Sequence, residues 1–550
     1  MKRVIRWVRF WGIWSYLPMA MLTYWVVRQA TDMIHINSLT QMVLIIVFPL
    51  LLPMEIAATN NRRRKRGLEP MTLAEVCGFS NVSIVTKQKN VATYPKIPEG
   101  YLQRRPEQLV LGLNNKKYVC VPIDLHNLLS NILIVGPPGA GKSVLIENIL
   151  LANNFIKRHF NYAMVDIKGE LVCKTSYLGD SNIHIFNPTD RLAVGWDVYF
   201  TLHVTANPTI DLQIEAFSDI AKALITGNEH DAYFIDNARS ILVGVMAWNY
   251  DKGDGQFITS VQALLLNDIG SLIDKIVKEY EDAGEQYSIA MLYLAKFKGK
   301  SGNESLQDIA TTVATPLSIF LKPSLVWALR DNPYMTSPAV LDDGHTCIDI
   351  NIPEYLVDSY ANLLRLMTTQ IADHCAKRPE SQFATALIFD ELPRYAPPIK
   401  TLKNILSLGR SRGIICINVV QSISQLQAPD CYAEADCNSI WALSELKIIL
   451  NCSDSQTAQW IQQSAGEYTD EAYSYKKKGI TNHVADMQYS QSDKHVIDLD
   501  ELASLRTKNE LICFVFGRYY RFSKLFYFKD PILSPIAEEV KRYNTSIIKS

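Results

Sequence analysis

The chain has 550 residues, which is too long for a single hydrophobic core, so two or three folded units are expected. Its formal net charge is −1, and its hydrophobic content of 48% is slightly high for a soluble protein. The ten cysteines form no C-x-x-C pair and no His-spaced pattern, which argues against a disulfide framework or a zinc site and predicts reduced, mostly buried thiols.

The hydrophobic excess lies at the start of the chain. Residues 10–27 and 38–58 are two apolar stretches of about the length that a bilayer requires. A secretory signal would have one apolar core and a small-residue cleavage site, whereas this sequence has two cores and no such site. We therefore predict a two-helix transmembrane anchor over residues 1–66.

Basic residues on both sides of this anchor predict its orientation. Four Lys or Arg residues precede the first stretch, residues 62–66 are all Lys or Arg, and the loop 28–37 holds one Arg and one Asp. The positive-inside rule then places both termini and the body of the protein in the cytoplasm, with a short loop outside. Residues 62–66 would also suit a nucleic-acid patch or a nuclear signal, but their place directly after an apolar stretch favours a membrane anchor.

The remainder of the chain is acidic. Residues 1–66 carry a net charge of +8 and the rest carries 45 Lys or Arg against 54 Asp or Glu, a net charge of −9. Such a balance argues against non-specific coating of DNA by the whole surface, and it leaves open a local basic lining inside a ring.

After a linker predicted over residues 67–100, β-rich apolar runs alternate with helical patterns. Several runs are continuous Val, Ile and Leu, which is typical of parallel strands buried on both faces. The pattern predicts an α/β doubly wound sheet formed by residues 101–202 and 323–530, followed by a C-terminal tail over 531–550. The predicted strands are 118–123, 132–135, 163–167, 183–186, 346–350, 386–389, 414–420, 447–450 and 511–516.

Residues 203–322 break this alternation and read as an inserted all-α domain. Apolar residues recur at helical spacing over 214–224 and again over 234–246. Ser271, with Asp274 three positions later, resembles a capped helix start for residues 272–280.

A glycine-rich turn between an apolar strand and a helical pattern matches G-x-x-x-x-G-K-S at every fixed position. Such glycines let consecutive backbone N–H groups turn inward around phosphate oxygens, at the positive end of a helix dipole. Lys142 would reach the β- and γ-phosphates, and Ser143 would hold Mg²⁺. The sequence therefore predicts a nucleoside triphosphate site whose loop consists of Gly136, Pro137, Pro138, Gly139, Ala140, Gly141, Lys142 and Ser143.

A P-loop needs an acidic residue at the tip of a neighbouring strand to orient Mg²⁺. Asp390 and Glu391 directly follow the strand 386–389 and fit best, with Asp390 serving the metal and Glu391 polarising the attacking water as general base. Asp166 and Asp349 also lie at predicted strand ends, but neither has an adjacent acid after four apolar residues.

Two further motifs suggest residues at the edge of this site. Gln421 follows the strand 414–420 and would sense the γ-phosphate, unless it is a solvent-facing loop residue. Arg410 and Arg412 lie just before that strand, where an arginine can act in trans as a finger in a ring-shaped ATPase. The alternative is an exposed arginine pair that caps a helix.

In order along the chain, these motifs resemble the type IV coupling proteins of bacterial conjugation and type IV secretion, the TraG/TraD type. Beyond the two spans, the resemblance rests on NILIVGPPGAGKS, MVDIKGEL, HIFNPTD, HDAYFIDNARSIL, LIFDELPRYAPPIKTLKNILSLGRSRGI and NCSDSQTAQWI. It implies a RecA-like P-loop NTPase core, six copies in a ring, and an inner-membrane ATPase that uses ATP and Mg²⁺. It also implies DNA, a relaxase and type IV secretion components as partners, with the DNA single-stranded, or double-stranded during translocation.

Matching of these motifs assigns nucleotide roles to Lys142, Ser143, Asp390, Glu391 and Gln421, with Arg410 as the finger. Pro137 and Pro138 depart from the smaller residues of many relatives. Two alternatives to a conjugative DNA motor remain: a DNA translocase of the FtsK kind, and a receptor that delivers protein cargo to a secretion channel. The inserted helical domain has neither a phosphate loop nor a strand-tip acid, so we expect it to bind cargo or a docking partner.

Overall fold

The computed structural model describes residues 57–58, 60–65, 83–88, 94–107, 109–122, 131–227, 231–379, 384–392, 402–428, 431–477 and 484–549. The chain divides into two compact units, the first formed by residues 1–92 and 467–496 and the second by residues 93–466 and 497–550. The predicted span 10–27, the loop 28–37 and all of span 38–58 except residues 57–58 lie outside the described residues.

The described part of the first unit contains a three-stranded antiparallel sheet in the order β1-β14-β15. Its strands are β1 (Ser83–Gln88), β14 (Glu467–Lys477) and β15 (Val484–His495). β1 lies inside the segment predicted as a linker, and none of the three strands was predicted. Among the described helices, none is long and apolar enough by itself to cross a membrane, while one bent pair, Glu304–Leu321 with Pro323–Asp331, meets those criteria by length and composition.

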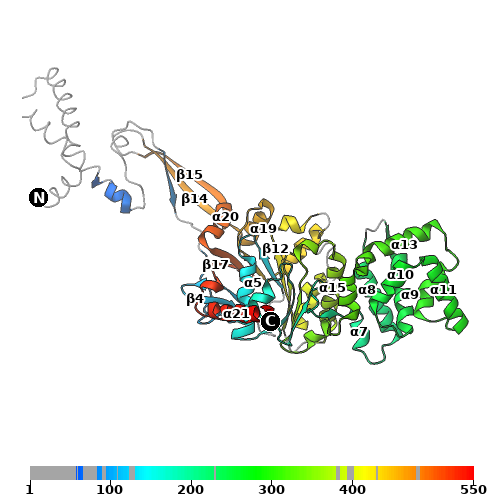
Figure 1. Ribbon diagram of the computed structural model, residues 1–550. Helices are drawn as coiled ribbons and strands as arrows, with labels where there is room; N and C mark the ends of the chain where they lie inside the picture. The colour runs from blue at the N-terminus through cyan, green and yellow to red at the C-terminus, as the bar shows by residue number, and fades with distance from the viewer. Residues whose placement is uncertain are drawn as a thin grey trace, which may run out of the picture. The chain divides into compact units, whose positions relative to one another are not determined.

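The second unit is built on a sheet of twelve strands, in which a run of seven strands is parallel (Figure 1). All seven were predicted from the sequence. They consist mostly of Ile, Val, Leu and Phe, because both faces of a parallel sheet are covered. In sheet order they are β13 (Leu446–Ile449), β5 (Asn131–Val135), β12 (Ile414–Val420), β11 (Ala384–Phe389), β6 (Phe160–Val165), β10 (Cys347–Ile350) and β7 (Ile183–Phe186).

The other five strands are antiparallel, so the sheet is mixed rather than purely doubly wound. Two-residue connections with positive φ reverse the chain at Asn115–Lys116 and at Phe516–Gly517, which forms tight hairpins. The predicted strands 118–123 and 511–516 belong to this antiparallel part, although residue 123 lies outside the described residues. From β13 outward the strands are β16 (Glu510–Val515), β17 (Arg518–Lys524), β3 (Leu109–Asn114), β4 (Lys117–Val121) and β2 (Leu102–Gln103).

Helices cover this sheet, and the last of them replaces the predicted C-terminal tail. Helix α21 (Leu533–Lys549) packs against α6 (Leu171–Thr175) and α5 (Lys142–Leu151). Its Asn544 is 4% exposed and donates to the carbonyls of Cys173 and Ser176. Other helices of the described core are α15 (Ala361–Lys377), α16 (Leu402–Leu408), α18 (Glu434–Leu443), α19 (Ser455–Ala465) and α20 (Leu499–Lys508).

Between the short paired strands β8 (Gly195–Trp196) and β9 (Met335–Thr336), the described residues form helices only (Figure 1, green). Helix α9 lies at the centre and contacts α8, α10, α12 and α13. The expected helix start at Ser271 is wrong, because Asp268 caps α11 by accepting the Ser271 N–H at 2.8 Å. The α-helices are α7 (Phe200–His203), α8 (Ile210–Leu224), α9 (Ala232–Asp251), α10 (Phe257–Leu266), α11 (Ile269–Ala283), α12 (Ile289–Leu294), α13 (Glu304–Leu317) and α14 (Pro323–Val326).

Candidate functional site

The glycine-rich turn lies between β5 and α5 and is held by its own backbone. Gly139 and Gly141 have φ of 74° and 98°, conformations that L side chains rarely adopt. The N–H of Gly136 donates to the carbonyl of Val420 at 3.2 Å, which fixes the start of the loop to the end of β12. The N–H of Ala140 closes the turn onto Pro137 at 3.1 Å. The loop therefore ends at the N-terminus of α5, where main-chain N–H groups have no helical partner and suit an anion.

Lys142 is the first residue of α5, and its side chain turns back into the loop. Its Nζ donates to the carbonyl of Gly136 at 2.8 Å, so the ammonium spans the concave side of the turn. Burial lowers the pKa of Lys142, while the carboxylates of Glu391 and Asp390 oppose that effect. The structure thus brings the predicted lysine and the two predicted acids into one electrostatic cluster.

Asp390 and Glu391 follow β11, which is separated from the P-loop strand β5 by β12 alone. Burial raises the pKa of Asp390 to about 6, and the neighbouring carboxylates of Asp166 and Glu391 add to the rise. Glu391 has a φ of 65°, so the chain leaves the strand in a sharp turn that few non-glycine residues adopt. Crowded carboxylates of this kind suit a cation shared with a phosphate.

The side chain of Gln421 is partly buried and has a partner within the site. Its Nε2 donates a hydrogen bond to Oε1 of Glu391, which joins the ends of β12 and β11. The loop after Gln421 is supported from α19, because the N–H of Ile423 donates to Oγ1 of Thr457 at 2.8 Å and that hydroxyl donates to Asp454 at 2.6 Å. The NCSDSQTAQWI motif therefore positions the loop that carries Gln421.

Asp166 and Asp349, the other two acids at predicted strand ends, have different surroundings from Asp390. Asp166 accepts the N–H groups of Leu171 at 2.6 Å and Lys168 at 3.2 Å, which folds the MVDIKGEL segment into a tight turn. Asp349 is completely buried in β10, and burial raises the pKa of its carboxyl well above the usual range. Lys168 in this turn is exposed and acts electrostatically on both Lys142 and Asp390. The sequence analysis did not predict Lys168 as a residue of the site, although the MVDIKGEL motif contains it.

The residues present fit a nucleotide with Mg²⁺ better than an isolated metal. Within the described residues no group of three or more His, Cys, Asp or Glu side chains is arranged to hold a metal ion. Mg²⁺ in such sites typically takes one or two protein oxygens and completes its coordination with phosphates and water. Ser143 at the start of α5 and Asp390 at the end of β11 are the protein oxygens that this arrangement offers.

The model of the type IV secretory system conjugative DNA transfer family matches residues 85–550. This chain belongs to that family. The recognition from sequence motifs is therefore confirmed. A comparison with curated proteins gave no match.

Among solved structures, the conjugative DNA transfer fold is seen in a bacterial conjugative coupling protein, TrwB. Its unbound form TrwBdeltaN70 matches with a TM-score of 0.59 and 17% identity over 77% of this chain and 90% of that chain. The complex with the GTP analogue GDPNP matches with a TM-score of 0.59 and 18% identity, over 79% of this chain and 93% of that chain. The complex with ADP and Mg²⁺ matches with a TM-score of 0.59 and 17% identity, over 78% of this chain and 91% of that chain. The likeness shows that this α/β core has the TrwB fold.

In this member of the conjugative transfer family, Arg410 and Arg412 have different surroundings. Nη1 of Arg412 donates to the carbonyl of Arg378, and Nη2 of Arg378 donates back to the carbonyl of Arg412 at 3.0 Å. Arg410 is half-exposed and lies 3.6 Å from Oε1 of Glu445. It precedes the amino end of β12, so seven residues of strand, about 20 Å, separate it from the P-loop edge.

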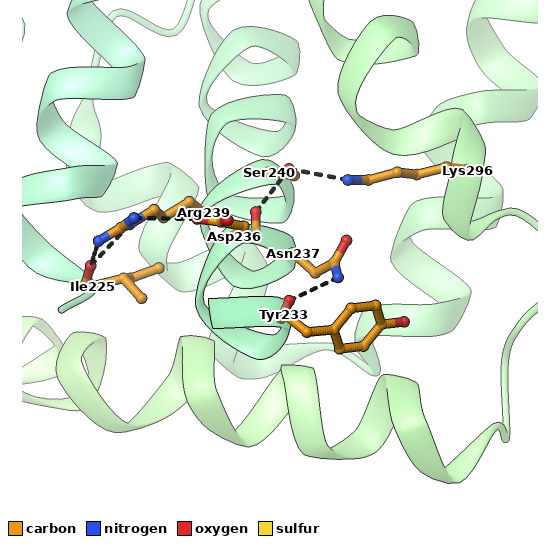
Figure 2. A network of polar contacts seen from close by, with 7 residues as sticks. All are labelled: Ile225, Tyr233, Asp236, Asn237, Arg239, Ser240 and Lys296. Atoms are coloured by element: carbon orange, nitrogen blue, oxygen red, sulfur yellow. Dashed lines mark hydrogen bonds and ion pairs between the residues drawn. The ribbon is translucent and has the colours of Figure 1, made fainter. Parts of the chain in front are cut away.

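Residues 232–242 of the HDAYFIDNARSIL motif of this family member lie on α9 of the helical insertion, and the arginine of the motif is structural. Arg239 donates through Nε and Nη2 to the carbonyl of Ile225, at 3.0 and 2.8 Å, just past the C-terminus of α8 (Figure 2). Arg365 of α15 donates to the preceding carbonyls of Ala223 and Leu224. Two arginines thus satisfy the last carbonyls of α8, which have no partner within the helix.

On another side of α9, the motif presents polar groups near α12. Lys296 Nζ donates to Oγ of Ser240 at 3.2 Å, and Asn237 Nδ2 donates to the carbonyl of Tyr233 at 2.8 Å (Figure 2). Tyr233 is 63% exposed. Tyr233 and Lys296 are both exposed, so this surface presents an aromatic ring and an ammonium group.

Proposed function

We propose that this protein is an ATPase that couples ATP hydrolysis to the transfer of DNA into a type IV secretion channel. The observation that carries the proposal is the junction of three strand ends, where Lys142 of the P-loop lies in the electrostatic field of Asp390 and Glu391. Gln421, hydrogen-bonded to Glu391, completes the same cluster. Family membership supplies the process, conjugative DNA transfer.

In this proposal each residue of the site has a separate role in ATP hydrolysis. Mg²⁺, when bound, neutralises developing charge on the phosphates. Backbone N–H groups of residue 139 and residues 141–143 bind the phosphate oxygens, and Lys142 exchanges its contact with the Gly136 carbonyl for the β- and γ-phosphates. Ser143 and Asp390 hold the metal. Glu391 accepts a proton from the attacking water, and Gln421 holds that carboxylate in its orientation. The solved TrwB complexes with GDPNP, and with ADP and Mg²⁺, support a nucleotide and Mg²⁺ as the ligands of this fold.

The proposal includes a homo-hexameric ring in which Arg410 acts on a neighbour. Arg410 lies at the amino edge of the sheet, whereas the P-loop lies at the carboxyl edge, so Arg410 is too far from its own nucleotide to contact it. A finger that reaches the adjacent subunit would tie each hydrolysis event to its neighbour. Arg412 is a poorer candidate because its guanidinium is bonded to the backbone at Arg378.

We further propose a bacterial inner-membrane location, with two spans in residues 1–66 and a cytoplasmic body. The support is the apolar pattern of residues 10–27 and 38–58 and the charge bias around them. The helical insertion is proposed to bind the cargo, a relaxase-bound single strand, or a component of the secretion system. Its exposed Tyr233 and Lys296 offer stacking and phosphate contacts of the kind that single strands favour.

The test is ATP hydrolysis by the purified full chain with Mg²⁺. Lys142→Ala should lower turnover by orders of magnitude because charge stabilisation of the phosphates is lost. Glu391→Gln should bind ATP and hydrolyse it slowly, and exposed Glu434→Gln on α18 is the matched control that should hydrolyse normally. Normal hydrolysis by Glu391→Gln would refute the assignment of the general base.

A further inference from the structure

Two cations from the C-terminal part of the chain reach the P-loop, outside every motif described above. Lys524 at the end of β17 is 9% exposed. Its Nζ donates to the carbonyl oxygen of Ala140 at 3.0 Å and to that of Leu450 at 2.9 Å. Since Leu450 directly follows β13, a single ammonium group joins the phosphate loop to the ends of two strands.

No carboxylate balances the charge of Lys524 within the described residues. Burial lowers the pKa of its ammonium to about 8, and the only charged group that adds to this effect is Arg506, another cation. A buried cation costs free energy unless an anion or several dipoles compensate it. Two carbonyl dipoles supply part of that compensation, and the concave loop above Ala140 is where an anion would supply the rest.

Arg506 approaches the same loop from the last turn of α20. A Cβ atom placed on Gly139 would lie 3.1 Å from Nη2 of Arg506. The guanidinium therefore lies against the P-loop backbone at a glycine, while the side chain as a whole is exposed. A planar guanidinium can pair two of its N–H groups with two phosphate oxygens, which a lysine does not do.

We propose that the segment from α20 to β17 completes the triphosphate site, with Arg506 as a further nucleotide-binding residue and Lys524 as a positioning residue for the P-loop. Arg506 contacts the phosphate oxygens of the bound nucleotide from the Gly139 side. Lys524 acts through the Ala140 carbonyl and holds the loop in its phosphate-binding shape. This inference rests on the proposed ATP-binding function and extends it to residues that the P-loop motif does not contain.

The Arg506 contact is tested by calorimetric titration of the full chain with a non-hydrolysable ATP analogue and Mg²⁺. Arg506→Gln should bind about tenfold to about a hundredfold more weakly than the wild type, as expected for loss of a charge-assisted contact. Arg518→Gln, an exposed arginine on β17, is the control and should bind normally. Wild-type affinity in Arg506→Gln would overturn the inference, whereas a wild type that fails to bind would overturn the proposed function itself.

The Lys524 contribution is separated from simple stability by two readouts. Lys524→Met should raise KM for ATP and reduce the rise in Tm that nucleotide produces, and Lys524→Arg should restore part of both because it restores the donors. Lys508→Met, an exposed lysine on α20, is the control and should leave both unchanged. If Lys524→Met lowers the Tm without nucleotide but keeps the full nucleotide-induced rise and the wild-type KM, Lys524 supports the fold alone and the positioning inference is refuted.

Discussion

Replacing Gln421 tests whether this side chain works through Glu391. Its Nε2 donates to Oε1 of Glu391, and both side chains are partly buried, so the bond is charge-assisted but open to some water. Such bonds contribute about 1.5–3 kcal/mol, and the partial exposure favours the lower end. With about 1.4 kcal/mol for each factor of ten, Gln421→Ala should reduce kcat for ATP about tenfold and leave KM nearly unchanged.

The decisive measurement is a double-mutant cycle in steady-state ATP hydrolysis. In a Glu391→Gln background, adding Gln421→Ala should change kcat by no more than about twofold, because the group that Gln421 orients has already lost its charge. Gln463→Ala on the exposed side of α19 controls for the loss of a glutamine. A full tenfold loss in both backgrounds would mean that Gln421 acts independently of Glu391, and the reasoning would be refuted.

The ring, the buried lysine and the membrane topology each have their own test. Arg410→Ala should bind ATP but hydrolyse it about 10³-fold or more slowly, and mixing it with Lys142→Ala subunits should restore part of the activity; unchanged hydrolysis by a monomeric Arg410→Ala protein would exclude the ring. Lys524, whose pKa burial and Arg506 lower to about 8, is charged below that pH and neutral above it. Wild-type affinity for ATP should therefore fall as the pH rises from about 7 to about 9 more steeply than that of Lys524→Met, and parallel profiles would contradict this. A reporter fused after Arg66 should be cytoplasmic and one in residues 28–37 external, and the reverse pattern would overturn the orientation.

The parallel part of the sheet was predictable because strands that are buried on both faces have continuous apolar sequences. The runs NILIV and IICINVV are apolar almost throughout and became β5 and β12. The P-loop and the acids after β11 were predictable because phosphate chemistry restricts the residue types at fixed positions. Parallel topology then brought Lys142, Asp390, Glu391 and Gln421 to one edge of the sheet, as the sequence suggested.

The antiparallel part gave a weaker signal. Strand β17 reads RYYRFSK, in which only alternate residues are buried, and its two-residue connection uses Phe516 where Asn or Gly would mark a turn. The strand was therefore missed, and Lys524 with it. Residues 531–550 were expected to be a tail, whereas most of them form helix α21, which Asn544 and the aromatic contact between Tyr177 and Tyr543 attach to the preceding core. Contacts between residues hundreds of positions apart produce no local sequence pattern, so this helix could not be predicted from them.

The residue pattern offered both Arg410 and Arg412 as a finger, and the family resemblance alone favoured Arg410. The structure distinguishes them by their side-chain partners, since Arg412 and Arg378 bond each other's carbonyls while the Arg410 guanidinium lies near the carboxylate of Glu445. Hydrogen bonds to main-chain carbonyls depend on the folded path of the chain, so side-chain type gives no warning of them.

The central claim, that ATP hydrolysis at this site drives DNA transfer, is tested most directly by the frequency of conjugative transfer in cells. A strain that depends on this protein should transfer DNA when supplied with the wild type or with Glu434→Gln. With Glu391→Gln, which is expected to bind ATP without hydrolysing it at a useful rate, transfer should fall by orders of magnitude although the protein reaches normal levels. Transfer at the wild-type frequency with Glu391→Gln would contradict the account.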